Sequence, residues 1–198
     1  MKKFALAPVS LALALALTGC NSSENKQAEV KAEATQAEKV AVANPFFAPW
    51  GTPHETPDFA KIKNEHYVPA FEKAISEQKA EIAAIIANAD APTFGNTIEA
   101  LEFSGNLLDN VAGVFYNLTS AETNDELKAI AKKVSPLLSA HSDDISLNAD
   151  LFKRVDAVYQ QKASLNLNTA QAKLLEDTYV GFVRSGAKLN QQEKEQIR

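Results

Sequence analysis

Apolar residues recur at helical spacing along most of this 198-residue sequence, and a helix start signal stands before each such stretch. We find no alternation of apolar and polar residues typical of strands, and no Asn-Gly hairpin signal. The sequence therefore predicts an all-α fold of antiparallel helical hairpins joined by short turns. The expected start signals, in chain order, are Pro69, Asn96 with Glu99, Asn124, Asn148, Thr169, and Asn190 with Glu193.

Local signals also predict how these helices begin and end. Pro69 is expected near the start of the first helix, where its missing N–H costs little. Pro136 is expected to bend or interrupt the third helix, and Gly186 to close the fifth. The residues expected to share a face, helix by helix, are Val68, Phe71, Ile75, Ile82 and Ile85; Ile98, Leu101, Leu108, Val111, Phe115 and Leu118; Leu127, Ile130, Val134, Leu138 and Ile145; Leu151, Phe152, Val155 and Tyr159; and Leu174, Leu175, Thr178 and Phe182.

The first twenty residues have the order of a bacterial lipoprotein signal. Two lysines precede an apolar run from Phe4 to Leu17, which is too short to span a bilayer, and Gly19 stands before Cys20, the one cysteine of the chain. The pattern predicts a signal peptide over residues 1–19 and acylation of the Cys20 thiol. The alternative is an ordinary signal peptide containing a cysteine, which leaves an exported protein with an unpaired thiol.

Residues 20–43 contain almost no large apolar side chain, so we expect a lipidated flexible tether. The lipid on Cys20 would hold the protein on a membrane of the cell envelope, facing the periplasm. Asn21 stands where an aspartate commonly marks inner-membrane retention, which favours the outer membrane. The chain has 25 acidic and 20 basic residues, two of them lysines of the signal, so the mature net charge is -7. Without a basic patch, no nucleic-acid partner is expected.

Residues 44–64 are aromatic and interrupted by proline, which excludes a regular helix. The aromatic residues are Phe46, Phe47, Trp50 and Phe59, and the prolines are Pro45, Pro49, Pro53 and Pro57. Two interpretations stay open for this segment. It is an extended arm laid over a helical body with its aromatic side chains as anchors, or it is a binding groove for a ligand.

We find no catalytic or metal-binding constellation in the sequence. His54-Glu55-Thr56-Pro57-Asp58 comes nearest to the zinc motif H-E-x-x-H, but an aspartate takes the place of the second histidine and the proline breaks the helix. His141 precedes Ser142, Asp143 and Asp144, but neighbouring residues of a helix point about 100° apart, unlike the members of a catalytic triad. We expect His141 to be a helix-face histidine near carboxylates.

Four stretches in order carry a family resemblance: Asp58–Ala70, Pro92–Glu102, Val114–Ala121 and Ala140–Ile145. Together they resemble the N-terminal region of the thimet oligopeptidase family of zinc metallopeptidases. The closest resemblance is to the bacterial peptidyl-dipeptidases, or dipeptidyl carboxypeptidases, with oligopeptidase A as a near relative. The sequence departs from the family pattern at Gly95, where the family usually has glutamate.

This resemblance implies a large, nearly all-α body with a deep channel that admits short peptides and excludes folded proteins. It also implies a zinc ion at the channel floor, held by an H-E-x-x-H helix and a more distant glutamate, which activates water. None of these residues maps onto this sequence. The implied role of residues 44–198 is therefore the channel wall of a parent peptidase, with zinc and the catalytic residues outside the chain and the remainder of the parent as partner.

The expected sixth helix, Asn190 to Arg198, has a start signal but only about two turns and no closing glycine, and such a helix is unstable alone. We therefore expect residues 44–198 to be truncated from a longer protein, with apolar surface left uncovered at Phe152, Phe182 or residues 46–50. The alternative is a non-catalytic helical envelope lipoprotein that binds peptides or acts as a scaffold. A third possibility is a generic helical lipoprotein with accidental similarity.

Overall fold

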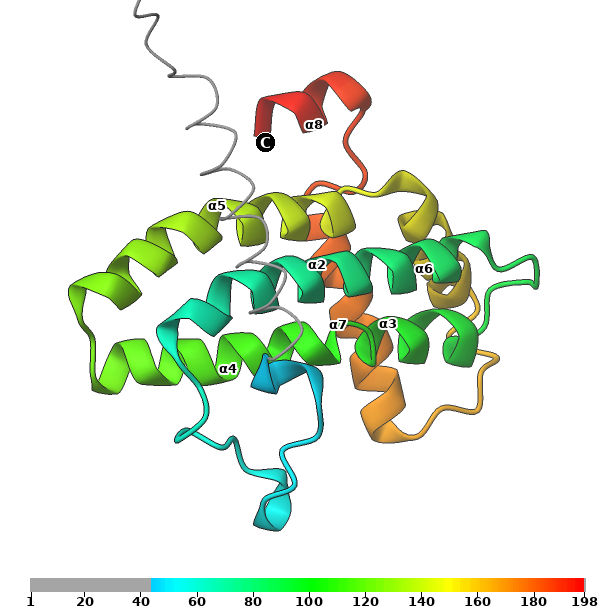
Figure 1. Ribbon diagram of the computed structural model, residues 1–198. Helices are drawn as coiled ribbons and strands as arrows, with labels where there is room; N and C mark the ends of the chain where they lie inside the picture. Colours follow the sequence, from blue (N-terminus) through cyan, green and yellow to red (C-terminus); the bar gives the residue numbers. More distant parts are fainter. Residues whose placement is uncertain (1–43, 198) are drawn as a thin grey trace, which may run out of the picture. The chain divides into compact units, whose positions relative to one another are not determined.

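The computed structural model describes residues 44–197, and every regular element in this range is helical (Figure 1). The predicted all-α fold is thus confirmed for this part of the chain. The elements are η1 (Pro45–Phe47), η2 (Pro53–Glu55), α2 (Asn64–Ala87), the π-helical turn η3 (Phe94–Glu99), α3 (Ala100–Glu102), α4 (Asn106–Ala121), α5 (Asp125–Ser146), α6 (Ala149–Gln160), α7 (Thr169–Arg184) and α8 (Gln191–Ile197). The expected signal peptide, the tether and Cys20 lie outside the described residues.

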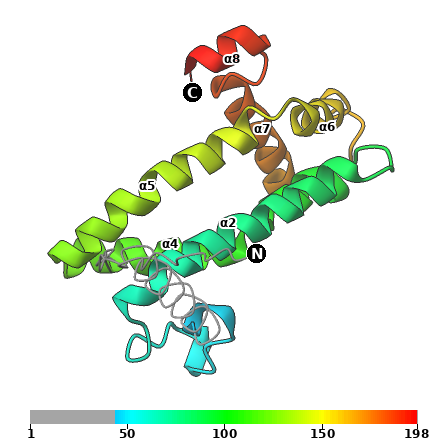
Figure 2. The ribbon, with the colours of Figure 1, turned by 45° about the horizontal axis from the view of Figure 1, so that its top comes forward.

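Helix α2 is the element against which most others pack, because it contacts η1, α3, α4, α5 and α6. Figure 2 shows α4 alongside α2, α5 diverging from both toward its C-terminal end, and α7 crossing between them. Within residues 44–197, no helix combines the length and the apolar character that a membrane crossing requires.

Two buried apolar clusters lie along α2. The first joins the N-terminal half of α2 to η1, α4 and α5, and its buried members are Phe46, Tyr67, Ala70, Phe71, Val111, Val114, Phe115, Leu127 and Val134. The second joins the C-terminal half of α2 to η3, α6 and α7, and its buried members are Ile82, Ile85, Ile98, Leu151, Val155, Val158, Leu175, Phe182 and Ala187. Each large apolar side chain buried in this way contributes about 1.5–3 kcal/mol.

The side chain of Gln78 links three elements at a point on α2 between the two clusters. Its Oε1 accepts a hydrogen bond from Nε2 of His141 on α5 at 2.8 Å, and its Nε2 donates to Oγ of Ser104 at 3.3 Å. Ser104 lies in the turn between α3 and α4, where the backbone N–H of Gly105 donates to Oε2 of Glu81 at 2.7 Å. We call Gln78, Ser104, Gly105, Glu81 and His141 the polar link.

Several predicted helix ends are confirmed. Asn124 and Asn148 cap α5 and α6 through their side-chain oxygens, and Asn190 forms a reciprocal capping box with Glu193 at the start of α8. Gly186, at φ +96°, closes α7 in a Schellman motif, with the N–H of Ala187 bonded to the carbonyl of Phe182 at 2.9 Å.

Other predicted ends are wrong. The cap before η3 is Thr93, whose Oγ1 accepts from the N–H of Asn96 at 3.1 Å, so Asn96 completes this capping box instead of starting one. Asn168, not Thr169, caps α7. The expected second helix is two helices, because Gly105 takes a left-handed conformation with φ +79° between α3 and α4.

Pro69 lies away from its expected place, and Pro136 does not interrupt its helix, while the expected bend at Pro136 stays a prediction. Helix α2 begins at Asn64, so Pro69 lies in its second turn and not at its start. Helix α5 continues without interruption through Pro136, whose side chain is exposed.

The expected uncovered apolar residues are mostly covered. Phe46 and Phe182 are buried, and Trp50 and Phe152 are half-buried, because α2 covers the arm and α6 packs on α7. The exposed apolar side chains lie elsewhere and include Phe103, which is 65% exposed. Helix α8 is fastened to the body by the buried Lys194, which donates from Nζ to the carbonyl of Leu147 at 3.1 Å.

We expect Gly105→Ala to lower the free energy of unfolding by about 1–3 kcal/mol, the range for a residue held in a disfavoured backbone conformation. An added Cβ would also lie 2.3 Å from Nε2 of Gln78 and would disturb the polar link. Gly113→Ala is the matched control, because Gly113 is helical, has open space around its Cβ position, and is expected to gain about 0.5–1 kcal/mol. Urea unfolding followed by circular dichroism measures both, and equal stabilities of the two variants would contradict this account.

Candidate functional site

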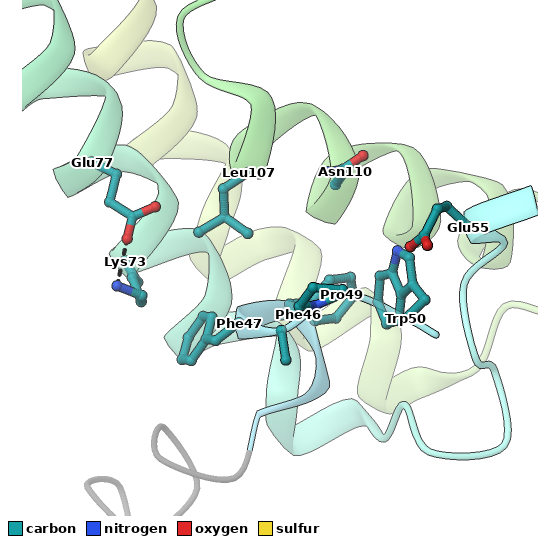
Figure 3. A pocket seen from close by; sticks show the side chains of 10 residues that line it. Phe46, Phe47, Pro49, Trp50, Glu55, Lys73, Glu77, Leu107 and Asn110 are labelled. Carbon is teal, nitrogen blue, oxygen red and sulfur yellow. Dashed lines mark hydrogen bonds and ion pairs between the residues drawn. The ribbon is translucent and has the colours of Figure 1, made fainter. Parts of the chain in front are cut away.

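A groove of about 490 Å³ lies between the N-terminal arm and helices α2 and α4 (Figure 3). The arm provides one wall, and polar side chains of α2 and α4 face it. The lining residues are Phe46, Phe47, Ala48, Pro49, Trp50, Glu55, Lys73, Glu77, Leu107 and Asn110. This arm groove combines aromatic and charged side chains in its lining.

The start of the arm is fastened to α2 by Asn44, which is buried. Its Oδ1 accepts from the N–H of Phe46 at 3.1 Å, and its Nδ2 donates to the carbonyl of His66 at 2.7 Å. Phe46 then packs between Trp50 and Tyr67, with ring centroids 5.3 Å and 5.6 Å away. Asn44 and Phe46 therefore fix where the aromatic wall of the groove lies.

The far end of the arm is a tight turn in left-handed backbone conformation. Gly51, His54 and Glu55 have φ values of +65°, +59° and +53°. This conformation is unfavourable for the two residues that carry a Cβ, at about 1–2 kcal/mol each. The Thr52 hydroxyl donates to the carbonyl of Thr56 and closes the turn. The strained turn places Glu55 on the lining of the groove.

The charges of the groove are unevenly paired. Lys73 and Glu77 form an ion pair on α2, and Nζ of Lys73 also lies 5.3 Å from the ring centroid of Phe47. The Glu55 carboxylate has no hydrogen-bond or ion-pair partner within residues 44–197. In Figure 3, Lys73 and Glu77 lie at one end of the groove, and Trp50 and Glu55 at the other.

Both open interpretations of residues 44–64 describe this segment in part. Phe46 is buried, and Phe47 and Trp50 pack against the first apolar cluster, as expected of anchors. The prediction that Phe59 is an anchor is wrong, because its side chain is 53% exposed. The anchored arm also forms a groove wall, and helical spacing in the sequence contained no signal for the facing residues Lys73, Glu77 and Asn110.

The residues of the near-zinc motif do not assemble into a metal site. His54 is exposed, and Asp58 forms an ion pair with Lys61 at 2.8 Å, whose hydrogen bond is the main cause that lowers the pKa of Asp58. No group of three or more histidine, cysteine, aspartate or glutamate side chains suited to a metal occurs in the part of the chain described. The residues present therefore do not fit the zinc ion that the family resemblance implies.

His141 lies on a helix as expected, but its ring is buried and faces α2. Because Oε1 of Gln78 can only accept, Nε2 of His141 carries the proton and donates at 2.8 Å. Its Nδ1 is buried and has no partner among the described residues. Burial lowers the pKa of His141, with a further lowering by Lys79 and an opposing effect of Asp144. Ser142 is exposed and takes no part in this contact.

His66 is a second buried histidine, and it caps α2. Its Nδ1 accepts the backbone N–H of Lys63 at 3.0 Å, which leaves this nitrogen unprotonated. Burial is the main cause that lowers the pKa of His66, against a smaller raising effect of Glu65. Neither histidine is a lining residue of the arm groove, and the hydrogen bonds of both join parts of the fold.

Comparison with known proteins shows similarity to bacterial peptidases, although no family profile matches the chain. The chain is 44% identical over 155 residues to dipeptidyl carboxypeptidase of Escherichia coli and 42% identical over 155 residues to that of Salmonella typhimurium. Each match covers 78% of this chain and 23% of the relative. Oligopeptidase A of Escherichia coli is 28% identical over 144 residues, which cover 73% of this chain and 21% of the relative.

The chain is a relative of these bacterial peptidases. The resemblance read from the four sequence stretches is thereby confirmed, and accidental similarity is wrong as an explanation. The chain spans about a quarter of the length of the curated relatives that it matches.

We expect the stability of the chain to fall as the pH is lowered from 7 to 5. Because the pKa of His141 is lowered in the folded state, the unfolded chain takes up a proton first as the pH falls. The contribution to stability is therefore complete above about pH 6.5 and is lost as the pH falls through the folded-state pKa. His66 contributes in the same direction.

His141→Gln should flatten this dependence, because glutamine stays neutral and can still donate to Gln78. His54→Gln, at an exposed histidine, is the control and should keep the wild-type dependence. Urea unfolding between pH 5 and 8 measures the three curves. A His141→Gln curve as steep as the wild-type curve would contradict the role assigned to this ring.

Proposed function

We propose that this chain forms the N-terminal helical region of a zinc-dependent peptidyl-dipeptidase that hydrolyses short peptides. The observation that carries the proposal is the 44% identity over 155 residues to a protein named dipeptidyl carboxypeptidase. The all-helical structure of residues 44–197 supports it, since the resemblance implies a nearly all-α body. The zinc site and the catalytic residues would lie in the remainder of the parent peptidase, which is then the chief partner of this chain.

In this proposal the chain shapes the peptide channel and performs no bond-breaking step. The described residues lack a zinc ligand set, and the sequence contains no H-E-x-x-H. Its contribution is the rigid pair of clusters along α2 and the arm that packs on them. Short peptides are the expected substrates of the parent, because the relatives are named dipeptidyl carboxypeptidase and oligopeptidase A.

The proposed location is the cell envelope, with lipid on Cys20 and the folded part facing the periplasm, at the outer membrane. The sequence Leu17-Thr18-Gly19-Cys20 after a short apolar run supports this, and Asn21 supports the outer membrane. The acidic charge balance argues against a nucleic-acid partner.

A second candidate is a non-catalytic envelope lipoprotein that binds peptides or acts as a scaffold. The arm groove favours its peptide-binding form, because the groove has aromatic walls and an unpartnered carboxylate. Reading the gene beyond the codon for Arg198 separates the two. A frame that continues to H-E-x-x-H supports the peptidase region, and a stop codon at that point supports the binding lipoprotein.

We expect the 198-residue chain to cleave no blocked oligopeptide when zinc is added, because it holds no zinc ligand set in its described part. Chromatography of the peptide after incubation measures this, with the complete dipeptidyl carboxypeptidase of Escherichia coli as the positive control. Metal-dependent cleavage by the purified chain would overturn the assignment of catalysis to the remainder of the parent.

We expect Cys20→Ser to abolish lipid attachment when the chain is expressed in a Gram-negative bacterium, because serine has no thiol to acylate. Incorporation of radiolabelled palmitate into the wild-type chain and into the variant measures the effect. Separating inner from outer membranes by density then tests the location, and equal labelling of the two chains would rule out Cys20 as the acylated residue.

A further inference from the structure

We propose that the Trp50–Glu55 end of the arm groove binds a positively charged side chain, lysine or arginine, of a short peptide. That the ligand is a peptide rests on the proposed function. The recognition itself is a matter of charge and aromatic surface in residues 46–110 and involves no zinc.

A cationic side chain of the protein itself, that of Lys73, already lies at the opposite end of the groove. The Lys73 ammonium lies 5.3 Å from the centroid of Phe47 and pairs with the carboxylate of Glu77. This wall therefore holds a cation with one aromatic face and one carboxylate, which are the two groups that attract ammonium and guanidinium ions in proteins. The contact of Lys73 with Phe47 and Glu77 is thus an example, in the same groove, of the kind of binding proposed for the other end.

The Trp50–Glu55 end has the same two groups. An indole attracts a cation more strongly than the phenyl ring of Phe47 does. Trp50 and Glu55 both line the groove, and in Figure 3 both lie at the end away from Lys73. Within residues 44–197, no lysine or arginine pairs with Glu55, and the cation–π contacts there involve Phe47, Tyr159 and Tyr179 and not Trp50.

The charge of the lining selects a cation over an anion. Glu77 neutralises Lys73, so the unbalanced charge of the groove is the negative charge of Glu55. The amide of Asn110 adds a neutral hydrogen-bonding group from α4. An excess of acidic residues in the whole chain adds a long-range attraction for cationic peptides at low ionic strength.

The proposed site is held in place before a ligand arrives. Trp50 packs edge-on against the buried Phe46, and the left-handed turn fixes the backbone at Glu55. A site that needs little ordering on binding loses less affinity to conformational entropy. His54 and Glu55 are both exposed, so their strained backbone adds nothing to the apolar clusters. Holding Glu55 at the groove gives this strain a role.

The test uses the intrinsic fluorescence of the chain, which contains a single tryptophan, Trp50. The probes are acetyl-Ala-Arg-Ala-amide and its citrulline counterpart, which has the same shape without the charge, and both are titrated into the 198-residue chain with EDTA present. We expect a saturable fluorescence change with the arginine peptide and an affinity about three- to tenfold weaker for the citrulline peptide. Equal affinities, or no binding of either peptide, would overturn the proposal.

Glu55→Gln should weaken binding of the arginine peptide about three- to tenfold, whereas Glu102→Gln, at an exposed glutamate on α3, should leave it unchanged. Both substitutions are at exposed positions, and circular dichroism checks the fold. Trp50→Phe, measured by calorimetry, should also weaken binding. If only a peptide with a free α-amino group bound, the site would recognise an N-terminus, and the side-chain proposal would be wrong. Because zinc is absent throughout, this test can fail while the proposed peptidase function stands.

Discussion

The structure of residues 44–197 depends on the hydrogen bonds of one amide, the side chain of Gln78. Both apolar clusters use α2, but the α3–α4 turn and α5 meet it there through polar contacts with Ser104 and His141. The Gln78 amide is half-buried, and an amide without partners costs at most about 1–3 kcal/mol there, which favours keeping the three elements in this arrangement. The conformation of Gly105 follows from it, because a Cβ at this position would occupy the space of the Gln78 amide.

The arm groove depends on the start of the same helix. His66 serves both the helix and the arm, since its Nδ1 accepts from the N–H of Lys63 and its carbonyl accepts from Asn44. The aromatic wall follows directly from this anchor, because Phe46 is two residues after Asn44. On the next turns of α2, Lys73 and Glu77 form the facing wall. A change that frayed the start of α2 would therefore move one wall of the groove relative to the other.

Local sequence signals predicted part of what local physics decides, since they identified the caps of α5 and α6 but misplaced those of η3 and α7. Asn124 and Asn148 cap their helices because a short polar side chain bonds the next free N–H groups whatever lies beyond. Prediction failed where a distant contact decides, as at Gly105, whose turn is set by Gln78 and Glu81 from another helix. The groove was predictable only on its aromatic side, because prolines and aromatics are conspicuous in the arm. The polar residues that face it, such as Lys73, have the spacing of any exposed helix surface.

The groove shares its aromatic side chains Phe46, Phe47 and Trp50 with the first apolar cluster, whereas its polar side chains belong to neither cluster, and this division bears on function. Phe46 and Asn44 are buried and hold the arm, whereas Glu55 and Asn110 are exposed and contribute no contact to either cluster. Groups that do not stabilise the fold are available to a ligand. In the proposed peptidase, a cation bound there, away from the reacting bond, would be held equally before and during peptide hydrolysis. Such uniform binding lowers KM and leaves kcat unchanged, so the groove would act on capture of a peptide and not on its cleavage.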